Sequence, residues 1–169
     1  GDGTIRKLLE VINKTSIPIY AIPGGNESLF AKHYAMSSRI EDLLQAISTG
    51  TCLQQFYGLI SGKSIRGEKP FFNMASMGLD SLTVKNIGKR KGPLNDSIYL
   101  WHGIRALCAL HHPIVSVSID GQQVIDAGSG YIIIANNSAY AKNLNLVPGA
   151  NASNDELVLG FLPGARHQH

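Results

Sequence analysis

Gly1-Asp2-Gly3-Thr4 opens the chain and leads directly into an amphipathic helix. Apolar side chains follow at the spacing i, i+3, i+4, i+7 and form one helical stripe: Ile5, Leu8, Leu9 and Ile12. Thr4 is expected to cap this helix. Glycines at a helix N-terminus leave backbone N–H groups open to an anion, because they carry no Cβ. The stretch is a candidate phosphate-binding turn, and an ordinary Asp-Gly turn is the alternative.

A second glycine turn, at residues 23–28, follows an apolar segment at residues 16–22 that is expected to form a buried strand. This turn also opens a helix, expected to end near Tyr34. In an open α/β sheet, ligands bind in the crevice beyond the carboxyl ends of the strands. Two glycine turns on one sheet edge therefore favour a nucleotide phosphate site. The alternative is that both are ordinary turns between a strand and a helix.

A third helix is expected at residues 39–48, with Ser38 and Glu41 as a capping box and Gly50 as the C-cap. Its apolar face is expected to consist of Ile40, Leu43, Leu44 and Ile47. Residues 1–49 thus resemble part of an α/β layered unit.

The character of the sequence changes near residue 50. Short apolar runs divided by Gly, Pro, Asn and Asp predict strands at 52–60, 71–76, 114–119, 122–126, 131–135 and 157–162. Asp120-Gly121 predicts a hairpin, and one helix is expected near residues 97–110. The predicted fold class is α+β, with a partial α/β nucleotide-binding unit at 1–49. An antiparallel β-sandwich with one inserted helix follows at 50–169.

The composition limits the possible functions. The chain has 169 residues, 44% of them hydrophobic, and a formal net charge of +3. This is enough apolar material for a core, and the charge is too small to indicate a nucleic-acid partner. Cys52 and Cys108 lack metal-ligand spacing and fit reduced thiols in the cytoplasm. No apolar run is long enough to predict a membrane-spanning helix.

Asp80 ends a stretch of small residues that begins at Asn73 and follows an expected strand. An aspartate in this position is an N-cap or turn residue in the ordinary case. A site carboxylate is the other possibility.

Four stretches together resemble the diacylglycerol kinase catalytic domain family, which includes sphingosine kinases and bacterial lipid kinases. Gly1-Asp2-Gly3-Thr4 resembles the end of its Gly-Gly-Asp-Gly-Thr motif, and residues 22–32 resemble its second nucleotide loop. Residues 73–81 resemble its Asn-x-x-x-x-Gly-x-Asp-Ala motif. Residues 136–149 resemble a later Asn-x-x-x-Tyr-Gly-Gly-Gly segment. The four stretches follow one another in the family's order.

This resemblance implies a kinase that uses ATP and Mg²⁺ to phosphorylate a lipid hydroxyl, on diacylglycerol, a sphingoid base or a similar lipid. It places Asp2 near the reacting phosphate, as a catalytic residue and metal ligand, and Asp80 near the cleft as a second catalytic residue. It implies nucleotide binding by Gly1, Gly3, Thr4, Gly25, Asn26, Glu27 and Ser28.

The sequence also departs from the family pattern. Asn26 and Ser28 replace a threonine and an asparagine of the second loop, and Ala141, Lys142 and Asn143 replace glycines. Family segments are expected before Gly1 and after His169, so the chain is expected to be an inactive internal part of a longer kinase. A non-catalytic lipid-binding relative and an NAD-kinase-like enzyme are the alternatives.

The expected location is cytoplasmic, with transient contact at a membrane surface. A basic loop containing Lys85, Lys89, Arg90 and Lys91 could approach anionic headgroups, although such a loop can also be simply solvated. Unpaired strands could favour a homo-oligomer.

Overall fold

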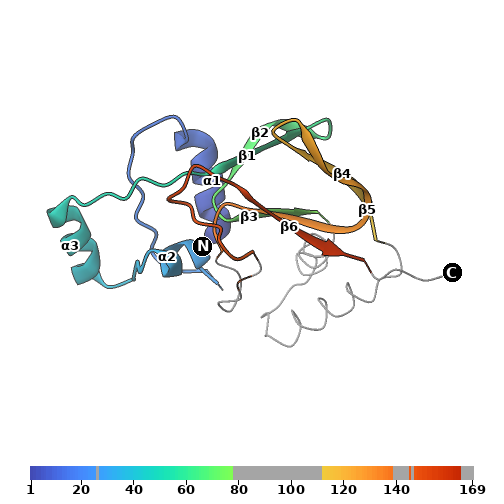
Figure 1. Ribbon diagram of the computed structural model, residues 1–169. Coiled ribbons are helices and arrows are strands. Elements are labelled where there is room, and N and C mark those ends of the chain that lie inside the picture. The colour runs from blue at the N-terminus through green and yellow to red at the C-terminus, as the bar shows by residue number, and fades with distance from the viewer. Residues whose placement is uncertain (26, 78–111, 139–144, 146, 165–169) are drawn as a thin grey trace, which may run out of the picture. The chain divides into compact units, whose positions relative to one another are not determined.

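The computed structural model describes residues 1–25, 27–77, 112–138, 145 and 147–164 (Figure 1). These residues form helices and antiparallel sheets, which confirms the α+β class. The chain folds as two compact units: Gly1–Ala75 with Ala135–Val158, and Ser76–Ile134 with Leu159–His169. It passes between them more than once, whereas the sequence suggests one boundary near residue 50; that boundary stays a prediction.

The first helix, α1, spans Asp2–Ile12 and begins earlier than expected. The N–H groups of Thr4 and Ile5 both donate to the carbonyl of Gly1, at 3.0 and 3.3 Å. Gly1 is therefore the N-cap residue, and the prediction that Thr4 caps the helix is wrong. An acidic residue in the first turn, Asp2, suits the positive end of the helix dipole.

Two further helices follow, α2 at Leu29–His33 and α3 at Ile40–Thr49. The C-cap prediction for α3 is confirmed, since Gly50 adopts the left-handed conformation with φ 61°. The predicted capping box is wrong: Arg39 is the N-cap residue and its side chain makes no capping bond. The helix start is bonded through Ser37 instead. Its hydroxyl oxygen accepts the N–H of Arg39, and its O–H donates to Asp42 in the first turn.

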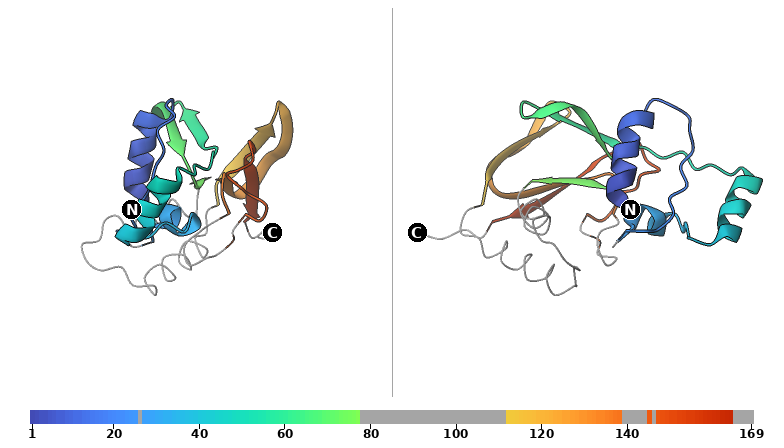
Figure 2. Two further views of the ribbon diagram at one scale, coloured as in Figure 1. Left: turned by 90° about the vertical axis from the view of Figure 1, so that its left-hand side faces the viewer. Right: turned by 180° about the vertical axis from the view of Figure 1, so that it is seen from behind.

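The core of the first unit gathers residues from several distant segments. Ile5, Ala21 and Ala31 are buried at its centre, and Ile19, Phe30, Met36 and Phe72 pack around them. In this unit α1 packs against α2 and against strand β2 (Figure 2). Residues 16–22, expected to be a strand, join no sheet within the described part of the chain.

Strands β1, Gly58–Gly62, and β2, Ile65–Phe71, pair as an antiparallel hairpin in the first unit. Gly58 lies opposite Phe71, and a Cβ at position 58 would overlap the ring of Phe71. Lys69 on β2 forms an ion pair with Glu10 of α1 at 3.3 Å. The sequence placed the first strand several residues too early.

A second sheet contains β3, Met74–Met77; β4, Ile114–Ile119; β5, Gln122–Ala135; and β6, Val158–Pro163. Its order is β3-β5-β4, and β6 also pairs with β5. The predicted hairpin between β4 and β5 is confirmed: Asp120 and Gly121 both have positive φ, 50° and 81°.

Strand β5 is one continuous strand where the sequence predicted two. The glycines at 128 and 130 indicated a break, but Gly130 instead lets the backbone of β6 come close to β5. A Cβ at position 130 would overlap the carbonyl oxygen of Leu162 on β6. Just after it, Tyr131, Ile132 and Ile133 are buried.

Some predictions fall outside the described residues: the helix near 97–110, Asp80 and the basic loop at 85–91. Among the helices that the structure describes, none combines the length and the apolarity needed to cross a bilayer.

Candidate functional site

The two glycine turns meet backbone to backbone. A Cβ built on Gly25 would lie 2.8 Å from the Cα of Gly1, and one built on Gly1 would lie 3.0 Å from the Cα of Gly25. Real Cβ atoms do not approach at the first of these distances, so a side chain at position 25 would push the turns apart. The structure therefore brings the two predicted phosphate-binding turns together.

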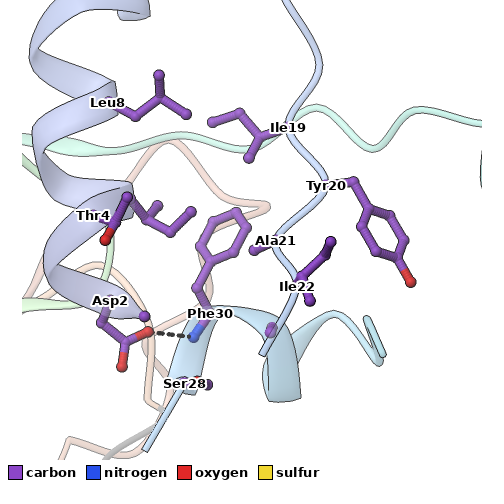
Figure 3. Close-up of a pocket in the computed structure, with 12 residues that line it drawn as sticks. Asp2, Thr4, Leu8, Ile19, Tyr20, Ala21, Ile22, Ser28 and Phe30 are labelled. Carbon is purple, nitrogen blue, oxygen red and sulfur yellow. Dashed lines mark hydrogen bonds between the residues drawn. The ribbon is translucent and has the colours of Figure 1, made fainter. Parts of the chain in front are cut away.

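Asp2 joins the first turn to the start of α2. Its two carboxylate oxygens accept the N–H groups of Leu29 and Phe30, each at 3.0 Å, and Figure 3 shows the bond to Phe30. These N–H groups belong to the first turn of α2, which has no partner for them within the helix. Asp2 thus stabilises the N-terminus of α2 from a helix that lies distant in the sequence.

The second turn is held by Ser28, which is only 4% exposed and has φ 48°. Its hydroxyl oxygen accepts the N–H of Gly25 at 3.0 Å, and its O–H donates to the Gly25 carbonyl at 3.2 Å. Glu27 turns toward Lys32, with 3.6 Å between Oε2 and Nζ. Asn26 lies outside the described residues. The hydroxyl of Ser28 therefore closes the turn on itself.

The N-terminus of α1 keeps free donors. The N–H groups of Asp2 and Gly3 make no hydrogen bond within the described residues, and a Cβ on Gly3 would meet nothing within 4 Å. Thr4 is exposed on the same turn. These donors could bind an anion without displacing a neighbouring side chain.

An apolar pocket of about 280 Å³ lies between α1, α2 and the segment at residues 19–22 (Figure 3). Its apolar lining includes Leu8, Ile19 and Phe30, and its polar lining includes Asp2 and Ser28. An apolar cavity of roughly 150 Å³ already admits benzene. The pocket is therefore large enough for several aliphatic carbons.

Aromatic rings support the pocket wall from behind. Phe30 makes edge-on contacts with Tyr34 at 4.9 Å and with Phe72 at 5.2 Å between ring centroids. His33 packs edge-on against Tyr34 at 4.6 Å. Partial burial lowers the pKa of His33 and raises the pKa of Tyr34, because removal from water disfavours the charged form of each. Both side chains are thus kept neutral.

Asn136 is a buried polar residue to which the sequence assigned no role. It is 1% exposed, and its side-chain NH₂ donates to the carbonyls of Phe56 and Phe72, each at 2.9 Å. Its own N–H and that of Asn137 donate to the carbonyl of Asn73 at 2.8 and 3.1 Å. Two stretches of the family resemblance therefore meet here. Paired asparagines directly after an apolar run were the available signal.

Mg²⁺ usually takes one or two carboxylates together with phosphate oxygens. Across the described residues, no three His, Cys, Asp or Glu side chains gather around one point. Asp2 is the predicted site carboxylate that the structure describes, since Asp80 lies outside. Each of its oxygens has a second lone pair beyond the bond to α2, so Asp2 fits the role of a single Mg²⁺ ligand beside bound phosphate.

The chain is an α+β protein in which two glycine turns form one polar corner of the first unit. No family model, curated protein or solved structure matches it.

Proposed function

We propose that this chain is part of a lipid kinase that transfers the γ-phosphate of ATP to a lipid hydroxyl. The observation that carries the proposal is the contact between Gly1 and Gly25, which forms a single corner from the two turns. Phosphoryl transfer requires positioning and charge neutralisation more than covalent chemistry, and a corner of backbone donors suits this need.

The residues of the corner divide the work. The N–H groups of Asp2 and Gly3 point out of the first turn of α1 and would bind phosphate oxygens. The carboxylate of Asp2 is held by the N–H groups of Leu29 and Phe30, and its remaining lone pairs would hold Mg²⁺. When bound, Mg²⁺ supplies neutralisation of the phosphate charge. Asp80 stays the second catalytic candidate.

The second candidate function is non-catalytic lipid binding, and one observation favours it. Both oxygens of Asp2 already satisfy the start of α2, so this side chain has a structural role that requires no nucleotide. In that case the corner stabilises the unit, and transient contact with a membrane surface needs no phosphoryl transfer.

Phosphoryl transfer from labelled ATP to diacylglycerol, sphingosine and NAD, measured with the longer kinase of which this chain is proposed to be part, tests these functions. Asp2→Asn should lower lipid phosphorylation by about 100-fold or more if the carboxylate takes part in the chemistry. Ser37→Ala is the matched control, because it removes hydrogen bonds at the entry to α3, outside the corner. Activity of each variant is normalised to the folded fraction, measured by thermal unfolding.

The outcomes separate the candidates. Lipid labelling that falls with Asp2→Asn and persists in Ser37→Ala supports the kinase. If neither lipid nor NAD is labelled but vesicles are bound, the kinase proposal fails in favour of the binding module. Labelling of NAD alone would indicate the NAD-kinase-like alternative.

A further inference from the structure

The segment at residues 17–22 has the pattern of a strand without belonging to a sheet. Figure 3 shows Ile19 and Tyr20 on opposite sides of the backbone, with Ile19 toward α1 and Tyr20 away from it. Ala21 returns to the α1 side and is buried. This alternation is typical of an extended strand with one face on a helix.

The backbone of this segment has unused hydrogen-bonding groups. Ala21 donates its N–H to the sulfur of Met36 at 3.1 Å, on one edge of the segment. In the described part of the chain, the backbone groups of Ile19, Tyr20 and Ile22 make no hydrogen bond. Because N–H groups alternate between the two edges of a strand, those of Tyr20 and Ile22 point away from Met36. This edge of the extended segment is unpaired within the described residues and could pair with another strand.

The unpaired backbone groups of this edge favour a second strand over an acyl chain as its partner. An acyl chain could enter the neighbouring apolar pocket, but it would cover the free N–H and C=O groups without satisfying them. A second strand satisfies both features, since its backbone pairs with the edge and its alternate apolar side chains cover the pocket mouth. The pocket walls at Leu8 and Ile19 lie on the face where those side chains would project.

We propose that residues 17–22 pair antiparallel with the same residues of a second copy of this chain, which makes a symmetric dimer. No charged residue occurs from Thr15 to Asn26, so nothing in the segment repels its own copy. Ile17 and Ile22 are 60% and 58% exposed, and cross-strand neighbours in the pair would cover part of each side chain. A two-fold interface uses the same patch twice, which a self-complementary strand provides.

One register fits the donors that the edge offers. With Tyr20 facing Tyr20 of the copy, these residues exchange two N–H···O=C bonds. Ile22 then donates to the carbonyl of Pro18 across the interface. Pro18 has no N–H to donate back to the Ile22 carbonyl of the other copy. That carbonyl is therefore the one group without a partner at each end of the paired segment.

A rival surface provides the control. The stripe on α3 formed by Ile40, Leu44 and Ile47 is also exposed, at 58, 58 and 68%. A helix offers no strand edge for pairing, and nothing in the structure indicates what would cover this stripe. It therefore tests whether exposed apolar area alone drives association.

Sedimentation velocity from about 1 to 100 µM measures the dimer. The unchanged chain should dimerise, Ile22→Lys should weaken the dimer at least about tenfold, and Ile47→Lys should leave it unchanged. Ile22→Pro removes one edge N–H without adding charge and should also weaken it. Ile22 is largely exposed, so these variants are expected to fold, which circular dichroism checks.

Hydrogen exchange gives an independent measurement on the unchanged chain. The N–H groups of Tyr20 and Ile22 should exchange at least about tenfold more slowly where the dimer dominates than where the monomer does. A chain that stays monomeric, a dimer broken by Ile47→Lys rather than Ile22→Lys, or unprotected N–H groups in the dimer would each overturn the proposal.

Discussion

Asp2 and Asn136 each tie together segments that are distant in the sequence, and they do so with opposite chemistry. Asp2 accepts two N–H groups at the start of α2. The Asn136 side chain instead donates to the carbonyls of Phe56, which precedes β1, and Phe72, which follows β2. Asp2 is partly exposed and Asn136 is 1% exposed. The contacts of Asp2 can therefore be lost more easily than those of Asn136, because water can replace a partner only at the surface.

The partners of Asp2 and Asn136 also differ in what can replace the lost side chain. If Asp2 is removed, the N–H groups of Leu29 and Phe30 belong to half-buried residues, where water can take the place of the carboxylate. If Asn136 is removed, the carbonyls of Phe56 and Phe72 lose the donor placed between them. An unsatisfied buried polar group costs about 1–3 kcal/mol. The hydrogen bonds of Asn136 should therefore contribute more to the stability of the first unit than those of Asp2.

Asn136→Asp is expected to have the largest effect. The substitution keeps the shape but replaces the donating NH₂ by an oxygen, so a buried charge would face two carbonyls. The loss should be about 4 kcal/mol at neutral pH. Thermal unfolding should show a fall of roughly 10 °C in Tm.

Asn151→Asp is the matched control for that prediction. Asn151 is exposed, and its side-chain oxygen accepts the N–H of Ser153 at 3.0 Å, a role that a carboxylate retains. Its stability should change by less than about 0.5 kcal/mol. Equal losses of stability in the two variants would show that the buried hydrogen bonds of Asn136 contribute no more than those of an exposed asparagine.

Gly25→Ala tests the other region and should cost less, about 2 kcal/mol. The added Cβ would lie 2.8 Å from the Cα of Gly1, so the two turns must separate and the Asp2 bonds to α2 lengthen. Gly3→Ala is the control, because a Cβ there meets nothing. It should leave the protein as stable or raise its stability by about 0.5 kcal/mol, since alanine is the better helix former. Chemical denaturation of both variants measures the contrast.

Local patterns predicted much of the fold. The Ile5 and Leu9 spacing indicated α1, Gly50 indicated the end of α3, and Asp120-Gly121 indicated the β4–β5 hairpin. Each of these depends on residues that are near one another in the chain. Gly130 was misleading because its role depends on Leu162, and a sequence pattern does not show which distant backbone approaches a glycine.

The candidate site divides in the same way. The two glycine turns indicated that Gly1 and Gly25 belong together, and the structure brings them into contact. The bonds from Leu29 and Phe30 to Asp2 depend on how α2 docks, which helical periodicity leaves open. The same limit explains α3, whose apolar stripe is typical of a buried helix although none of its residues is buried.

The smallest expected effect concerns His33, the last residue of α2, whose first turn Asp2 holds. Burial lowers its pKa, so between that pKa and its usual value of 6.5 the unfolded chain binds more protons than the folded one. The stability contributed by neutral His33 is therefore present above about pH 6.5 and is lost as the pH falls through the lowered pKa.

Thermal unfolding of the unchanged chain and of His33→Gln, between about pH 5 and pH 8, measures this term. The unchanged chain should gain stability relative to the variant as the pH rises. The remaining histidines are common to both proteins, so their titration cancels in the difference. A difference that stays constant with pH, or that shrinks as the pH rises, would show that partial burial does not favour the neutral form of His33. The environment of His33 would then add no pH-dependent stability to the α2 region, and its ring contact with Tyr34 would act through packing alone.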